Sequence, residues 1–186
     1  MINKKIFISI FFLLTCFVSL LYADSIYNIE FNVKMYNQND YDIFYYKNYK
    51  EIAKQAFRNN KLVKTTGEFP DGTINLVNFN NIPVAVVNMK NNKLDGICTF
   101  FQERYTQRTI VEQNYDKIIS EYKDGMLNGI TKVVDKYGDI IFELNYKNNI
   151  LDGQSVYYDY NLMKKQVILF NNGIKSSEST YDLERE

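Results

Sequence analysis

The sequence predicts an all-β protein, a single-layer antiparallel β-meander of repeated hairpins with an N-terminal capping strand. Two observations lead to this fold class. A motif of eight residues that ends in glycine recurs along the chain, and recurrence at a fixed period of this length indicates a repeat architecture. The runs that connect its copies show the two-residue alternation of β-strands. The repeats indicate how the chain is built, and they do not identify a partner.

Residues 1–23 have the pattern of a secretory signal peptide. Lys4 and Lys5 form a positive start, the run after them is almost wholly apolar, and Ala23 ends this run before Asp24. We expect export through the Sec pathway. The mature chain would then begin at Asp24 and reside in the periplasm, at the envelope or outside the cell.

Two other interpretations of this segment stay open. An uncleaved membrane anchor needs about 20 apolar residues, and this run is shorter. A lipoprotein would carry its lipid on Cys16, but Thr15 is unusual before such a cysteine. Apolar residues also follow Cys16, where a polar tether is expected. Secretion is therefore the better supported interpretation.

The mature segment has room for one domain and a narrow range of chemistry. It would keep 163 of the 186 residues, and the loss of Lys4 and Lys5 changes the formal net charge from +0 to −2. This balance argues against nucleic acid as the main partner. Cys98 would be its only cysteine, so an internal disulfide is excluded. The chain contains no histidine, which excludes Ser-His-Asp and Cys-His sites and the usual zinc ligand sets.

Residues 24–44 are expected to hold the capping strand and a turn. From Tyr27 to Met35 apolar and polar residues alternate without a fault, so that Ile29 and Phe31 share one face with Met35. This strand does not fit the repeat. We therefore interpret it as the cap that an array of repeats needs at its end.

Residues 45–58 permit two interpretations. Asn48 and Glu51 have the spacing of a capping box, and apolar residues from Tyr49 to Phe57 follow at helical spacing. The same segment, however, parallels residues 157–173 with a shift of one position. This similarity favours a β-hairpin over a helix.

The repeats are predicted to form one sheet over residues 45–177. The copies of the motif are residues 89–96, 122–129 and 146–153, with a shortened copy at 170–175. Each has an Asn-Asn or Asp-Gly corner, and these residues tolerate the positive φ angles of tight hairpin turns. In the run from Phe142 to Tyr146, alternate residues face the same side. One repeat is therefore two short strands and two turns.

The motifs of residues 122–129 (Tyr-x-x-Gly-x-x-x-Gly) and 146–153 (Tyr-x-x-Asn-x-x-x-Gly), together with Phe69-Pro-Asp-Gly72-Thr-Ile, resemble MORN-variant repeats. Bacterial proteins described as YwqK-like antitoxins contain such repeats. The resemblance covers roughly residues 45–175. It implies a β-meander used for association and transfers no catalytic residue. An antitoxin role follows only from the family label, and it fits poorly with an export signal.

No residue pattern indicates a catalytic, metal or cofactor site. Cys98 occupies the repeat position of Thr131 and Ser155, which indicates a small strand residue rather than a nucleophile. The repeated Asp or Asn before each glycine is too sparse for calcium, which takes six to eight oxygen ligands, and turn chemistry explains it. A pair of carboxylates brought together by the fold would permit a small hydrolase. That enzyme is one alternative hypothesis.

Two sets of residues are candidates for an interaction surface. The first is a ladder of aromatic residues at one repeat position, whose simpler explanation is packing between strands. The second is a basic segment able to contact anionic lipid headgroups, whose simpler explanation is a solvated face. The first set is Tyr122, Tyr146 and Phe170, preceded by Phe69 and Met89, and the second is Lys47, Lys50, Lys54, Arg58 and Lys61, followed by Lys64.

We expect a non-enzymatic exported scaffold that binds an unidentified protein partner, as a monomer and without a cofactor. A membrane-surface adaptor is the second alternative. Residues 102–118 are expected to be a charged insertion that forms a longer hairpin, and residues 178–186 an acidic, flexible tail with little to bury.

Overall fold

The computed structural model describes residues 26–102 and 115–184. The expected signal peptide lies outside these ranges, as do most of the insertion and the last two residues of the tail. No helix in the described part of the chain is long and apolar enough to cross a membrane.

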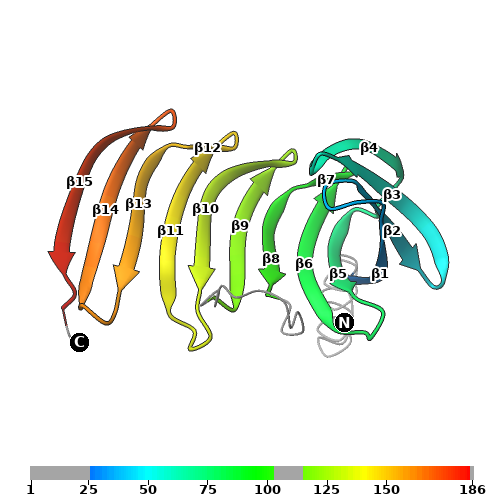
Figure 1. Cartoon of the computed structure of the whole chain (residues 1–186), viewed down its shortest axis with the longest axis horizontal. Coiled ribbons are helices and arrows are strands. Elements are labelled where there is room, and N and C mark those ends of the chain that lie inside the picture. Colours follow the sequence, from blue (N-terminus) through cyan, green and yellow to red (C-terminus); the bar gives the residue numbers. More distant parts are fainter. Residues whose placement is uncertain (1–25, 103–114, 185–186) are drawn as a thin grey trace, which may run out of the picture.

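The described residues form a single open sheet and no helix, which confirms the predicted all-β meander (Figure 1). Its first strands are β1 (Ile26–Met35), β2 (Tyr41–Lys47), β3 (Lys50–Arg58), β4 (Lys61–Gly67), β5 (Gly72–Val77), β6 (Pro83–Lys90), β7 (Lys93–Leu94) and β8 (Gly96–Phe101). The others are β9 (Lys117–Lys123), β10 (Met126–Val134), β11 (Ile140–Lys147), β12 (Ile150–Leu151), β13 (Gly153–Asp159), β14 (Lys164–Asn171) and β15 (Ile174–Asp182).

From β5 to β15 the strands follow one another in chain order, each antiparallel to its neighbour. The two-residue strands β7 and β12 pair with β6 and β11 beside this main path. The segment expected to be either a helix or a hairpin forms β2 and β3, so the hairpin interpretation is confirmed.

The N-terminal strand is present, but it does not lie at the end of the sheet. β1 pairs in parallel with β5 and antiparallel with β2, and the hairpins β2 to β4 extend the sheet beyond it. The edge strand at this end is β4. Because β1 has a paired strand on each of its two edges, a cap formed by β1 alone is corrected to a rolled end formed by β1 to β4.

The acidic tail also differs from the expectation. The segment from Glu178 to Asp182 belongs to β15 and pairs along β14. All nine residues of β15 are exposed, so the expectation that this segment buries little is correct. Backbone pairing with β14 is sufficient to order it as a strand.

The tight turns have the geometry predicted from their sequence. Both central residues of a two-residue turn have positive φ in six hairpins, as type I′ turns require. These pairs are Asn48 and Tyr49, Asn59 and Asn60, Asn91 and Asn92, Asp124 and Gly125, Asn148 and Asn149, and Asn172 and Gly173.

Successive repeats are joined through these turns as well as through their strands. The backbone N–H of Gly125 donates to the Leu94 carbonyl at 2.8 Å, and that of Gly173 donates to Leu151 at 2.7 Å. Asn149 donates to Leu127 in the same way at 2.9 Å. The turns thus form a continuous row along one margin of the sheet.

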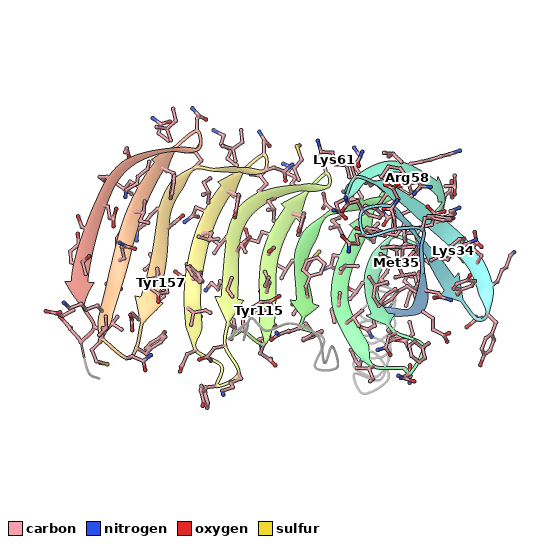
Figure 2. The ribbon with its side chains drawn as sticks, in the orientation of Figure 1. Lys34, Met35, Arg58, Lys61, Tyr115 and Tyr157 are labelled. Carbon is pink, nitrogen blue, oxygen red and sulfur yellow. The ribbon has the colours of Figure 1, made fainter. Side chains whose placement is uncertain are left out.

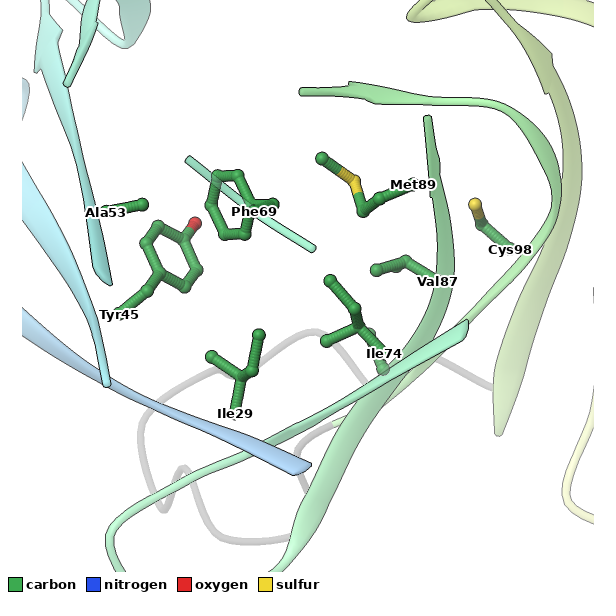
Figure 3. Packing of buried hydrophobic residues seen from close by; sticks show 9 residues of the cluster. Ile29, Tyr45, Ala53, Phe69, Ile74, Val87, Met89 and Cys98 are labelled. Carbon is green, nitrogen blue, oxygen red and sulfur yellow. The ribbon is translucent and has the colours of Figure 1, made fainter. Parts of the chain in front are cut away.

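The hydrophobic core lies at the N-terminal end, where β1 to β4 turn out of the plane of the other strands (Figures 1 and 3). Phe69 lies in the middle of this end, and the ring of Tyr45 meets it edge-on at 4.8 Å. Burial raises the pKa of Tyr45 to about 12. The cluster is completed by Ile29, Ala53, Ile74, Ala85, Val87, Met89 and Cys98.

Candidate binding surfaces

The aromatic ladder is built into the sheet. Tyr122 lies in register with Gly96, Tyr146 with Gly129, and Phe170 with Gly153. All three rings are partly buried. An aromatic side chain beside a glycine covers backbone that the glycine leaves bare. This arrangement supports packing as the main role of these residues.

A row of small residues runs beside the ladder on the same face. Cys98, Ser120, Thr131 and Ser155 are all buried, and three of them, Cys98, Thr131 and Ser155, share one repeat position. The Thr131 hydroxyl donates to Ser120 at 3.0 Å, and Cys98 Sγ lies 3.9 Å from the Gly96 carbonyl. Burial raises the pKa of the Cys98 thiol. A buried thiol with a raised pKa is a poor nucleophile, which supports its interpretation as a strand residue.

The basic segment is not a uniform positive surface. Asp42 lies between Lys54 Nζ at 2.6 Å and Arg58 Nη1 at 2.9 Å. Lys47 sits over the ring of Tyr27, with its Nζ 4.1 Å from the centroid. The remaining members, Lys50, Lys61 and Lys64, are exposed. Three of the six basic side chains therefore make contacts within the protein. This weakens the case for the segment as a lipid-binding patch.

The aspartates before the repeat glycines make hydrogen bonds to the facing strand and to the neighbouring turn. Asp95 and Asp152 each donate their backbone N–H across the bulge, to Asn88 at 2.9 Å and Asn145 at 3.0 Å. Asp95 Oδ2 also accepts a hydrogen bond from the backbone of Asp124 at 3.2 Å. In residues 26–102 and 115–184 no three acidic or cysteine side chains are grouped as a metal site.

A groove that the motifs did not reveal lies at the ends of the strands that are farthest from the ladder. It encloses about 740 Å³. Its floor is a row of apolar side chains in register across β9, β10, β11 and β13. The residues of this row are Ile118, Val133, Phe142 and Tyr157.

Tyrosines dominate the groove. Tyr115 and Tyr157 lie toward the lower ends of the strands in Figure 2, and Tyr137, Tyr158 and Tyr160 also line it. The rings of Phe142 and Tyr157 are 5.0 Å apart. Tyr137 is 78% exposed, so it is available to a partner.

Hydrogen bonds and ring contacts fix the position of two of these tyrosines. The rings of Tyr158 and Tyr160 are nearly parallel, with centroids 6.1 Å apart, and the Tyr160 hydroxyl donates to the Ile140 carbonyl at 2.9 Å. Burial first, and then the carboxylate of Asp139, raises the pKa of Tyr160. Burial and then Glu143 raise the pKa of Tyr158. Both hydroxyls therefore stay protonated at neutral pH.

The rim of the groove is acidic. It contains Asp135, Asp139 and Asp159 against one cation, Lys136. The Oδ1 atom of Asp135 accepts the backbone N–H of Tyr137 at 2.8 Å and that of Asp139 at 2.9 Å. Asp159 Oδ1 holds the next turn in the same way. These carboxylates are thus held in place by the turns from which they project.

The repeat motif does not include the residues that line this groove. The one signal in the sequence was the coincidence of tyrosine with the corners 135–139 and 159–161. Tyrosine is common throughout the chain, with 16 copies, so that coincidence alone carried little weight.

Comparison with models of protein families and with curated proteins finds no match to this chain. The resemblance to MORN-variant repeats thus depends on the motifs themselves.

Proposed function

We propose that this chain is a non-enzymatic, exported scaffold that binds a segment of a partner protein in the tyrosine-lined groove. The observation that carries the proposal is the groove itself, where aromatic rings from several strands and turns meet at an acidic rim. Tyrosine is enriched at protein interfaces because its ring is apolar and its hydroxyl is polar. The association role that MORN-variant repeats imply agrees with this reading.

The charge of the rim indicates the chemistry of the partner. Three aspartates and one lysine favour a cationic segment, and tyrosine rings bind Lys or Arg side chains through cation–π contacts. The volume of about 740 Å³ lies within the range of ligand pockets. It suits a few side chains of an extended segment rather than a whole domain.

The site supports binding better than hydrolysis. The groove lies on an open single-layer sheet, whereas an enzyme cleft that closes shields its reacting groups from bulk water. Two of its three aspartates are turn acceptors through Oδ1. The geometry therefore offers a surface for docking.

A crosslinking experiment in the native cells tests the function. A photoreactive residue at Tyr137 should capture a specific protein, whereas the same residue at Tyr49, which is 93% exposed on the β2–β3 turn, should not. Equal capture from both positions would refute the groove as the binding site. Capture of polysaccharide or of anionic lipid in place of protein would also overturn the proposal.

The charge of the partner is tested with a matched pair of variants. Asp135→Asn combined with Asp159→Asn removes two charges and keeps both Oδ1 acceptors. The control, Asp71→Asn with Asp95→Asn, removes two turn carboxylates elsewhere. A labelled lysine-rich peptide should bind the groove variant roughly three- to tenfold more weakly than the control. Equal affinity of the two variants, or preference for a glutamate-rich peptide, contradicts the assignment.

A further inference from the structure

The sheet ends in two strands that have a neighbour on one side only among the described residues. β4 pairs with β3, and β15 pairs with β14. Every residue of both strands is exposed, and neither strand contains proline. Open edges of this kind have unpaired backbone N–H and C=O groups that can pair with another strand.

The hydrogen bonds at the strand ends show which backbone groups of β4 point outward. The Glu68 N–H donates to the Ile52 carbonyl at 3.0 Å, so Ile52 and Glu68 form a hydrogen-bonded pair. These pairs alternate with non-hydrogen-bonded pairs along an antiparallel ladder. Gln55 and Thr65 form a pair of the second kind. The N–H and C=O of Thr65 therefore face away from β3.

The same reasoning applies at the other edge. The Leu183 N–H donates to the Met163 carbonyl at 2.8 Å, and Thr180 lies opposite Gln166 in the same register. Alternation from Leu183 makes this a non-hydrogen-bonded pair. The backbone groups of Thr180 therefore face outward, as do those of Glu178.

The topology sets the direction in which the two edges would meet. Between β15 and β5 there are eight antiparallel pairings, and the β1–β5 pairing is parallel. Three further antiparallel pairings lead from β1 to β4. β4 is therefore antiparallel to β15. An antiparallel contact between β15 of one copy and β4 of the next would therefore continue the alternation of the sheet, with the second copy rotated to align its turned-out end.

The charges of the two edges are complementary. β4 carries Lys61 and Lys64 and no acidic residue, whereas β15 carries Glu178 and Asp182 with one cation, Lys175, which forms an ion pair with Glu178. Opposite charges across a strand pair are stabilising, and like charges are destabilising. Pairing of β4 with β4 would bring the lysines together. Pairing of β4 with β15 avoids this.

We propose that β4 of one copy pairs with β15 of the next, so that this chain assembles head to tail. The contact is heterologous, since it uses two different surfaces, and it leaves one edge of each kind open at the ends. The sequence alone predicted a monomer. The complementary exposed edges are the reason to expect an assembly.

Two proline variants of the full chain test this proposal. Thr65→Pro blocks the outward edge of β4, and Thr180→Pro blocks that of β15, in both cases without removing a bond to the inner neighbour. In light scattering, the mass of the unmodified protein should rise with concentration. Each variant alone should stay monomeric, and an equimolar mixture should form a dimer of one copy of each.

The mixture separates this contact from symmetric alternatives. A Thr65→Pro variant that still self-associates would show β15–β15 pairing, and a mixture that stays monomeric would exclude β4–β15 pairing. Either result overturns the proposal, as does an unmodified protein that stays monomeric at millimolar concentration.

A second pair of variants removes the dependence on proline. Lys61→Glu with Lys64→Glu should abolish assembly, and adding Glu178→Lys with Asp182→Lys to the same chain, so that both edges reverse their charge, should restore it. Absence of this rescue would contradict charge-selected pairing, and circular dichroism of every variant would verify folding.

Discussion

At the scale of single residues, the surroundings of Asp42 show how a charge is retained in a sheet with a small core. Its side chain is only 2% exposed. Besides Lys54 and Arg58, the hydroxyl of Tyr36 donates to it at 2.9 Å. The bond from Lys54, followed by those from Arg58 and Tyr36, lowers the pKa of Asp42 from 3.8 to about 2 despite the opposing effect of burial.

This shift predicts a dependence of stability on pH. Because the pKa of Asp42 is lower in the folded state than in the unfolded state, its contribution is fully present above pH 3.8 and is lost as the pH falls toward 2. We expect Asp42→Asn to lower the urea midpoint at pH 7. The midpoints of the variant and the unmodified protein should converge as the pH approaches 2.

The control for this experiment is Glu51→Gln, which removes an exposed carboxylate from β3. Parallel pH profiles for Asp42→Asn and the unmodified protein would show that the ion pairs do not stabilise the fold.

Tyr146 and Phe170 provide a second test at this scale. Loss of a large aromatic side chain from a core costs about 3–5 kcal/mol. Tyr146 is only partly buried, so we expect Tyr146→Ala to cost about 2–3 kcal/mol. Phe170→Ala should cost less, because the residue beyond it on β15 is Lys175 and repeat stability depends on nearest neighbours.

Chemical denaturation of both variants measures the difference. Equal and negligible losses would show that the ladder contributes to an exposed binding surface instead of to packing.

At the scale of elements, the type I′ turns determine the hairpins. Asn148 has φ 51° and Asn149 has φ 67°. Asn149 has a further role, since its side chain accepts the Leu127 N–H at 2.7 Å while its own N–H binds the Leu127 carbonyl. The corner therefore shapes one hairpin and attaches it to the one before.

We expect Asn148→Val to destabilise the protein by about 1–2 kcal/mol, because a residue with a Cβ branch resists the left-handed conformation. Asn148→Gly should be nearly neutral, since glycine adopts this conformation without steric cost. Thermal unfolding of the two variants decides the matter. A valine variant as stable as the glycine variant would mean that the turn changes type at little cost.

Local patterns were sufficient to predict the hairpins. The φ angles at Asn148 and Asn149 follow from residue type, and the place of Cys98 in a strand follows from its equivalence to Thr131 and Ser155. Strand alternation likewise placed Phe142 and Tyr146 on one face.

The position of β1 depended on pairing between distant segments. Ile29 pairs with Leu76 in a parallel register, and nothing within either segment specifies that neighbour. Alternation along β1 predicted one continuous apolar face. Ile29 is indeed buried, but Met35 is 57% exposed, and it lies in the part of β1 that extends beyond the pairing with β5.

The groove could not be predicted for a related reason. Its floor requires Ile118, Val133 and Phe142 to lie in one row, which depends on register across three strands. A register shift between Val133 and Val134 also interrupts the pairing of β10 with β11 next to this row. A bulge of this kind is visible only in the paired sheet.

At the scale of the whole molecule, burial is distributed unevenly. The main cluster lies among β1 to β8, whereas β15 has no buried residue. In repeat proteins each unit is stabilised mainly by its neighbours. The C-terminal hairpin, with a neighbour on one side, should therefore open first.

Hydrogen exchange tests this gradient. In dilute monomeric protein, we expect the amides of β15 to exchange fastest and those of β5 and β6 to exchange slowest, because opening free energies rise from frayed ends to core strands. Uniform protection from β5 to β15 would instead indicate that the sheet unfolds as one cooperative unit.

The row of turns has a consequence for how the length of this protein can change. Gly125, Asn149 and Gly173 make the same bond to the preceding repeat, so a duplicated unit of 24 codons would find its attachment point already present. Each added unit would lengthen the sheet by two strand spacings, roughly 10 Å. The length of the sheet can therefore change by whole repeats through gene duplication, because each added repeat makes the same contacts as the existing ones.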